Sequence, residues 1–204
     1  ARVPSGGSAD TQGQAWGLLI SLRRLAELDI GARAHVLGPG QVGFFHLLFP
    51  HQAAHDLALL AQYGRSVRTY SAIDGLEVIP ELARKHGLNV TLGAWLDQRT
   101  ETNKREIDSL IDLGKRYDNV TRLVVGNEAI LRADLTVREL AQYLRQVRKA
   151  VNKPVSTAEP WHVWLRFPEL VQEVDFIAVP TLQNLPPKFP FWGSTVVFEL
   201  RVFN

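Results

Sequence analysis

From residue 51 onward, amphipathic helical patterns alternate with short runs of apolar and β-branched residues. The runs that predict strands lie at 66–70, 89–95, 121–125, 155–158 and 175–179. The segments with helical periodicity lie at 56–63, 77–86, 102–117 and 137–151, with a shorter one at 168–173. Successive strands begin 20 to 34 residues apart, which is about the length that a crossover with one helix requires. The pattern therefore predicts βα units and a parallel sheet.

Local signals mark where some of these helices begin and end. Thr136 is followed three residues later by Glu139, which predicts a capping box before the helix that runs to about Val151. Gly87 predicts the end of the helix at 77–86, and Pro80 is tolerated only in the first turn of that helix.

The N-terminal part of the chain follows a different pattern. Residues 1–41 are predicted to form an extension with one helix, because leucines between 18 and 28 recur at spacings of three and four. Glycines and a proline at 31 and 38–40 are expected to interrupt regular structure there. The segment 42–204 is predicted to be a single (β/α) domain, with 42–49 as an irregular first strand and an atypical sequence after residue 180.

Composition narrows the possible classes. The 23 basic and 21 acidic residues give a net charge of +2, so no nucleic-acid partner is expected. The absence of cysteine excludes disulfides, thiolate catalysis and cysteine-ligated metal sites. The longest apolar runs are far too short to cross a bilayer, so no membrane span is predicted. The absence of methionine predicts that the chain begins inside a longer reading frame.

The residues that follow the strands distinguish a barrel from an open sheet. No strand is followed by the glycine-rich turn that an open nucleotide-binding sheet uses, so a phosphorylated ligand is the less favoured alternative. Polar and aromatic residues stand there instead: Arg68, Tyr70, Trp95, Asp97, Asn127, Glu128, Glu159, Trp161 and His162. Because the βα loops of a barrel converge on one substrate, the expected fold is a (β/α)8 TIM-type barrel, incomplete at about six of eight βα units.

The strand that ends at Gly126, Asn127 and Glu128 carries the clearest candidate chemistry. Gly126 has no side chain to obstruct a ligand, and Asn127 can donate and accept hydrogen bonds with sugar hydroxyls. A partly desolvated Glu128 stays protonated near neutral pH and can act as a general acid. In the alternative interpretation, Asn127 and Glu128 cap the following loop or pair with a nearby arginine.

Five segments in order strengthen the first interpretation. They are Val67–Ser71, Leu88–Asp97, Val125–Glu128, Val155–Trp161 and Val174–Val179. Together they resemble bacterial glycoside hydrolase family 17 over roughly residues 56–179. This resemblance implies retaining hydrolysis or transglycosylation of β-1,3-glucan, with Glu128 as acid/base and Asn127 beside the sugar 2-hydroxyl. It implies a periplasmic or membrane-associated location. No cofactor is expected, because carboxylates cleave glycosides without metal, and the oligomeric state is not predicted.

The other strand-end side chains are predicted to bind substrate. They are Arg68, Tyr70, Trp95, Glu159, Trp161 and His162, with Trp164 a weaker candidate. Each has an ordinary alternative: Arg68 can orient a carboxylate, and the aromatic residues can belong to the core. Glu159 can instead raise the pKa of Glu128 by like-charge repulsion, and a lone histidine such as His162 is weak evidence for metal.

A retaining mechanism also needs a second carboxylate about 5 Å from the first. The family's seventh-strand Glu motif has no counterpart in this sequence. Glu199 is a weak candidate, because Leu200 and Arg201 follow it where small residues and a tryptophan are expected. Two functions stay open: a β-1,3-glucan-active glycosidase or glucanosyltransferase, and a non-catalytic glucan-binding or inactive fragment that lacks the nucleophile.

Overall fold

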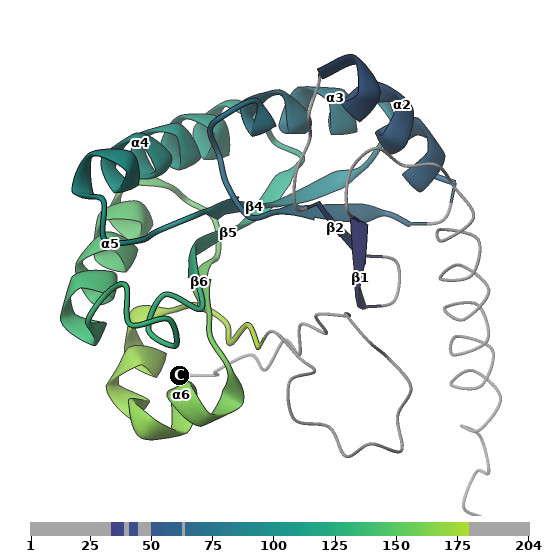
Figure 1. Ribbon diagram of the computed structural model, residues 1–204. Coiled ribbons are helices and arrows are strands. Elements are labelled where there is room, and N and C mark those ends of the chain that lie inside the picture. Colours follow the sequence, from purple (N-terminus) through teal and green to yellow (C-terminus); the bar gives the residue numbers. More distant parts are fainter. Residues whose placement is uncertain (1–33, 39–40, 45–49, 63, 180–204) are drawn as a thin grey trace, which may run out of the picture. The chain divides into compact units, whose positions relative to one another are not determined.

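The computed structural model describes residues 34–38, 41–44, 50–62 and 64–179 (Figure 1). The chain divides into two units, 1–30 and 31–204, and every described residue belongs to the second unit. The predicted N-terminal helix and the segment that contains Glu199 lie outside the described residues, and the boundary predicted near residue 41 stays a prediction.

The described residues form a six-stranded sheet whose spatial order follows the sequence (Figure 1). Its strands are β1 (Ala34–Gly38), β2 (Gln41–Phe44), β3 (Ser66–Thr69), β4 (Asn89–Ala94), β5 (Val120–Asn127) and β6 (Val155–Ala158). β1 pairs antiparallel with β2, and each later pair of neighbours is parallel. The predicted α/β class with a parallel sheet is therefore confirmed. Closure of this sheet into a barrel stays a prediction.

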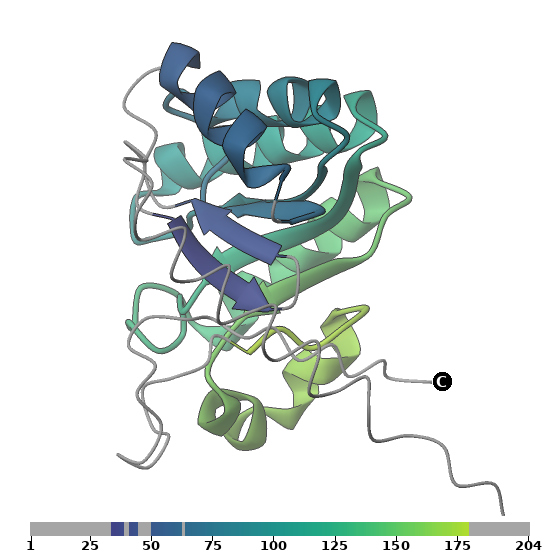
Figure 2. The same ribbon diagram turned by 90° about the vertical axis from the view of Figure 1, so that its right-hand side faces the viewer.

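Helices cover one face of the sheet, as the two perpendicular views show (Figures 1 and 2). The helices are α2 (Pro50–Leu60), α3 (Ile79–Lys85), α4 (Thr100–Arg116), α5 (Val137–Ala150) and α6 (Trp161–Arg166), with 3₁₀ turns η1 (Leu76–Val78) and η2 (Pro168–Glu173). Apolar residues three or four apart place one side of each long helix in the core, as Leu140, Leu144 and Val147 do in α5. The predicted capping box is present, because Thr136 Oγ1 accepts a hydrogen bond from the Glu139 amide at 3.3 Å.

Three elements differ from the sequence-based expectation. The first is β1, since the sequence predicts that glycine at residue 38 interrupts regular structure. In the structure, Gly38 pairs with Gln41 at the end of a hairpin. α6 is an addition that begins directly after Pro160, a residue with no amide hydrogen for a strand ladder. The strand expected at 175–179 is reduced to a parallel bridge between Ala158 and Ala178.

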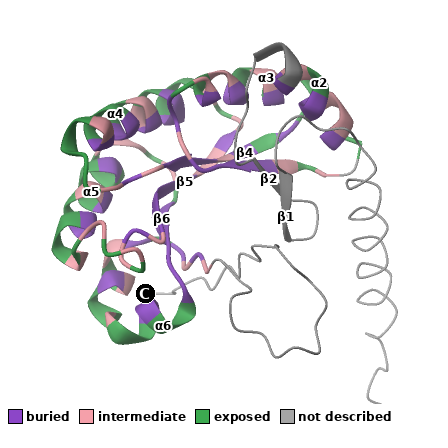
Figure 3. Ribbon diagram, viewed as in Figure 1, coloured by how far each residue is buried: buried purple, intermediate pink, exposed green. Residues whose placement is uncertain are grey.

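The carboxyl-terminal residues of β3, β4, β5 and β6 are buried (Figure 3). All four residues of β6 and the last five residues of β5 are buried. Close packing extends to the backbone at Gly93 in β4, where a Cβ atom would lie 2.4 Å from the Thr69 carbonyl oxygen. The last side chains of these strands are therefore attached to closely packed backbone.

Candidate functional site

The parallel strands bring several predicted site residues to one edge of the sheet. Arg68 lies in β3 with Tyr70 just after it, Trp95 follows β4, and Asn127 ends β5. Because β3, β4 and β5 are parallel neighbours in register, their carboxyl ends meet at the same edge. This is the edge at which βα loops build binding sites in α/β proteins.

Arg68 is the buried centre of this group. Its side chain is 1% exposed, its Nη2 donates a hydrogen bond to Asn127 Oδ1 at 3.0 Å, and its Cζ lies 4.6 Å from the centroid of the Tyr70 ring. Burial lowers the pKa of Arg68, while the negative charge of Glu128 acts in the opposite direction. The structure thus brings Arg68, Tyr70, Asn127 and Glu128 together.

Two nitrogens of this guanidinium are unsatisfied. Arg68 Nε and Nη1 are buried and have no hydrogen-bond partner. Buried polar atoms are satisfied in most proteins, and an unpaired charged donor carries a large desolvation cost. The two donors are therefore arranged to receive an acceptor that the described residues do not supply.

The backbone at the end of β5 is strained. Gly126 has φ +80° and Glu128 has φ +55°, both in the left-handed region, and the pairing of β5 with β6 shifts register between Val124 and Asn127. A non-glycine residue in this region is held there only when its surroundings fix it. The Glu128 amide donates to the Ala158 carbonyl at 2.7 Å, and the Glu128 carbonyl accepts from the Arg132 amide at 2.9 Å. Half-buried Glu128 is therefore fixed through its own peptide groups.

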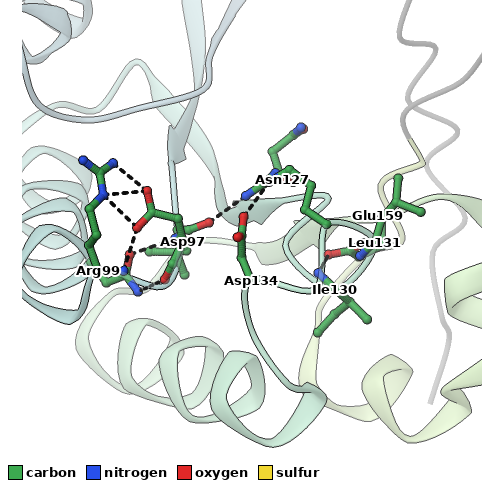
Figure 4. Close-up of polar contacts among 10 residues, drawn as sticks. Asp97, Arg99, Asn127, Ile130, Leu131, Asp134 and Glu159 are labelled. Carbon is green, nitrogen blue, oxygen red and sulfur yellow. Dashed lines mark hydrogen bonds and ion pairs between the residues drawn. The ribbon is translucent and has the colours of Figure 1, made fainter.

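Glu159 lies inside the protein and holds the loop that follows Glu128. Its Oε1 accepts a hydrogen bond from the Ile130 amide at 2.9 Å, and its Oε2 accepts one from the Leu131 amide at 3.3 Å (Figure 4). Burial raises the pKa of Glu159 to about 7, and the negative charge of Glu128 adds to this, against the two amides and Arg132. Glu159 is 0% exposed, and both of its carboxyl oxygens support the loop. Its contact with a sugar hydroxyl stays a prediction.

Arg132 connects the ends of β4 and β5. Its Nη2 donates to the Leu96 carbonyl at 2.7 Å, its Nη1 donates to the Asn127 carbonyl, and its Nε donates to Asp134 Oδ2 at 2.7 Å. Its Cζ also lies 4.3 Å from the centroid of the Trp95 ring. Sequence reasoning missed Arg132, because a charged residue in a loop is usually solvated.

Glu106 in α4 is a second residue that sequence reasoning missed. It is 2% exposed, and its carboxylate accepts hydrogen bonds from Ser71 Oγ at 2.5 Å and from the Ala72 amide at 2.8 Å. The Trp95 amide also donates to it, and burial raises its pKa above the ordinary value. One helix side chain thereby joins the segments that follow β3 and β4.

The aromatic residues of α6 occupy two environments. Trp164 is buried, and its Nε1 donates to the Glu159 carbonyl at 2.9 Å, which places it in the core. Trp161 is 56% exposed and meets the exposed His162 ring edge to face at 5.7 Å. Among the described residues, no hydrogen bond or ring contact joins Trp161 or His162 to Glu128.

The described residues contain neither a cluster of metal ligands nor a helix that could span a membrane. Within the ranges given above, no three histidine, aspartate or glutamate side chains converge as a metal site. None of the helices in those ranges is long and apolar enough to cross a membrane.

Comparison with known proteins identifies the class and then the family. The profile of the BtgE/BtgC glycoside hydrolase domain matches residues 50–199, which include the whole site described above. The chain therefore belongs to this family of glycoside hydrolase domains. Membership of glycoside hydrolase family 17 stays a prediction.

Two of the curated relatives are fungal proteins. A probable β-glucosidase (btgE) of Aspergillus flavus is 33% identical over 120 residues, covering 55% of this chain and 20% of that protein. A probable glucan endo-1,3-β-glucosidase (btgC) of Aspergillus clavatus is 31% identical over 171 residues, covering 76% of this chain and 23% of that protein. The chain thus spans about a fifth to a quarter of the length of these two relatives. These relatives do not confirm the bacterial source that the resemblance to bacterial family 17 implies.

One solved structure shows a weak likeness. The apo β-glucuronidase from Ruminococcus gnavus aligns with a TM-score of 0.42 and 17% identity, over 64% of this chain and 24% of that one.

Proposed function

We propose that this chain carries the acid/base half of the active site of a retaining, β-1,3-glucan-active glycosidase or glucanosyltransferase of the family 17 type, built on a (β/α)8 barrel. Glu128 is the acid/base. The observation that carries the proposal is the end of β5, where Asn127 is oriented by buried Arg68 and the backbone of Glu128 is fixed in the left-handed region.

The orientation of Asn127 suits a sugar hydroxyl. Its Oδ1 is occupied by Arg68 Nη2, so its Nδ2 group keeps two hydrogens for donation. By resemblance to family 17, the acceptor is the 2-hydroxyl oxygen of the sugar whose glycosidic bond breaks. A hydrogen bond to this hydroxyl that is stronger in the transition state than in the bound substrate accelerates cleavage.

Glu128 acts twice in the proposed reaction. As an acid it gives its proton to the glycosidic oxygen while the bond from that oxygen to the anomeric carbon breaks. A second carboxylate attacks the anomeric carbon and forms a covalent glycosyl ester. The ionised Glu128 then takes a proton from the incoming oxygen, which displaces the ester. Water as the incoming group gives hydrolysis, and a sugar hydroxyl gives transfer.

The second carboxylate comes from outside the described residues in this proposal. Glu159 is a poor candidate, because both of its oxygens accept hydrogen bonds from loop amides and its side chain is fully buried. The unsatisfied Nε and Nη1 of Arg68 offer a carboxylate two donors beside Glu128. Glu199 stays a weak candidate for that group.

Aromatic side chains supply the sugar-binding surface in this proposal. One face of the half-buried Trp95 ring is covered by the Arg132 guanidinium, so the opposite face is the one that can stack on a pyranose. Tyr70 lies against Arg68 at the same strand edge. Exposed Trp161 and His162 on α6 serve as a more distant contact for a longer glucan.

The direct test is incubation of the purified chain with laminari-oligosaccharides, followed by chromatography of the products. We expect Glu128→Gln to abolish sugar release and Glu169→Gln, which changes an exposed glutamate, to leave it intact. Unchanged turnover in Glu128→Gln would remove Glu128 from the mechanism.

Non-catalytic glucan binding is the second candidate function. It is favoured by the sequence, which has no counterpart of the seventh-strand Glu motif that supplies the nucleophile in family 17. In that case calorimetry detects binding of laminarihexaose, and prolonged incubation yields no product. Binding that disappears in Trp95→Ala but survives in Glu128→Gln would support this role.

A further inference from the structure

We infer that Arg132 is a positioning residue that holds the strained backbone of Glu128 and the ring of Trp95 in place for glycoside cleavage. This inference rests on the proposed role of Glu128 as acid/base. It concerns a loop arginine that touches neither the substrate nor the reacting atoms.

Arg132 helps to fix the peptide group that joins Asn127 to Glu128. Its carbonyl oxygen accepts a hydrogen bond from Arg132 Nη1, and its amide donates to the Ala158 carbonyl at 2.7 Å. Both polar atoms of this peptide are therefore fixed, which prevents its rotation. Since the φ angle of Glu128 is +55°, rotation of this peptide would let the residue relax to a common conformation.

Arg132 donates hydrogen bonds to the carbonyl groups of both Glu128 and the residue before it. Its own amide donates to the Glu128 carbonyl at 2.9 Å, while its side chain reaches back to the preceding carbonyl. A side chain that closes such a short loop can define the direction in which the glutamate carboxyl points. A displacement of about 1 Å in a catalytic group lowers rate by up to about a hundredfold.

Arg132 also contacts two residues that follow β4. Arg132 Nη2 donates to the Leu96 carbonyl at 2.7 Å, and the guanidinium plane lies against the Trp95 ring, with Cζ 4.3 Å from the ring centroid. The same group therefore fixes the spacing between the acid/base and the proposed sugar-stacking ring. Asp134, whose Oδ2 accepts from Arg132 Nε at 2.7 Å, sets the rotation of the guanidinium.

This geometry requires arginine. A planar fork donates in three directions and stacks on an aromatic ring at once, whereas a lysine ammonium is a compact charge that cannot do both. The Arg132 side chain is 25% exposed and that of Asp134 is 20% exposed, so the pair is shielded from most of the solvent. Arg132→Lys is therefore expected to behave more like Arg132→Ala than like the unmodified protein.

The experiment compares kcat/KM for two substrates that differ in their need for an acid. Laminari-oligosaccharides need protonation of the leaving oxygen, whereas a dinitrophenyl β-laminaribioside releases a stable phenolate without it. We expect Arg132→Ala and Arg132→Lys to lower kcat/KM about tenfold or more for the oligosaccharide and much less for the aryl glycoside. A loss of folded protein would lower both values equally, and that result would overturn the inference.

Arg166→Ala is the matched control, because Arg166 also stacks on an aromatic ring, with Cζ 5.3 Å from the centroid of Phe167. Arg166→Ala should leave kcat/KM unchanged for both substrates. Asp134→Asn provides a milder variant that removes only the charge partner of Arg132. We expect it to give an intermediate, oligosaccharide-selective loss, and an equal loss on both substrates would contradict the inference.

A readout without substrate separates this inference from the proposed function. The indole N–H resonance of Trp95, assigned by its disappearance in Trp95→Phe, and the Glu128 amide resonance should both shift in Arg132→Lys and stay in place in Arg166→Ala. If the unmodified chain cleaves no glucan but these shifts occur, the proposed activity fails while the positioning role stands. Unshifted resonances in Arg132→Lys would overturn the positioning role.

Discussion

Arg68 donates a hydrogen bond from Nη2 to Oδ1 of Asn127 at 3.0 Å, across 59 positions of sequence. This bond fixes the amide of Asn127 with its oxygen turned inward. The remaining donors of the same guanidinium are buried and unsatisfied. An arginine that carries this desolvation cost contributes more to the site than to folding.

Replacement of Arg68 by methionine tests whether this arginine contributes to the site and not to folding. Methionine fills a similar volume without burying a charge, so we expect the free energy of unfolding to change by no more than about 1 kcal/mol in either direction. Glucan cleavage or binding should be lost, because Asn127 is no longer oriented. Urea unfolding and calorimetry measure the two effects. A stability loss above about 3 kcal/mol would instead show that the charge supports the fold.

The buried carboxyl group of Glu159 predicts a pH-dependent stability. Its pKa rises from an ordinary 4.5 to about 7 on folding, so the folded state binds this proton more tightly than the unfolded state. The free energy of unfolding should therefore fall as pH rises through this interval and level off above it. The contribution is at most about 3 kcal/mol.

The measurement is urea unfolding at pH 5 and pH 8 for the unmodified chain and for Glu159→Gln. Because glutamine does not titrate, the loss of stability between these two pH values should be smaller in the variant. Glu169→Gln, at an exposed site, should follow the unmodified chain. Equal pH dependence in all three proteins would show that Glu159 keeps an ordinary pKa.

Replacement of Glu106 should lower the free energy of unfolding, although the sequence gives its position in α4 the look of an ordinary helix surface. Glu106→Ala leaves the Ser71 hydroxyl and the Ala72 amide without their acceptor, at a cost of about 1–3 kcal/mol. Hydrogen exchange at Ala72 should accelerate by a corresponding factor. Glu101→Ala changes an exposed glutamate of the same helix and should alter stability by less than about 0.5 kcal/mol.

Gly93 predicts a steric effect between β3 and β4. A Cβ atom there would lie 2.4 Å from the Thr69 carbonyl oxygen, so Gly93→Ala should force the two strands apart and cost about 3 kcal/mol. Gly87 has φ +69° and no atom within 4 Å of the added Cβ. Gly87→Ala should therefore cost only the backbone strain of about 1–2 kcal/mol. Thermal unfolding compares the two, and equal losses would argue against the clash.

Much of the secondary structure and one part of the site follow from local sequence. Helical and strand periodicity placed β3, β4, β5, β6, α4 and α5 within a few residues of their observed bounds, because side-chain spacing is a local property. The position of Asn127 at the end of β5 also follows from the apolar run before it. Turn chemistry was harder to interpret, since Gly38 ends a strand of a hairpin instead of interrupting it.

The support of the site depended on tertiary structure. Glu159 meets amides 28 and 29 positions away, Arg132 meets a carbonyl 36 positions away, and Glu106 meets a hydroxyl 35 positions away. A sequence marks such residues only as charged, and charged residues are usually solvated. Parallel pairing of the strands brings these distant segments to one edge and removes water from them. The sequence by itself determined which residues end the strands, and packing decided which charged side chains hold the backbone, because only the folded chain brings them within hydrogen-bonding distance of it.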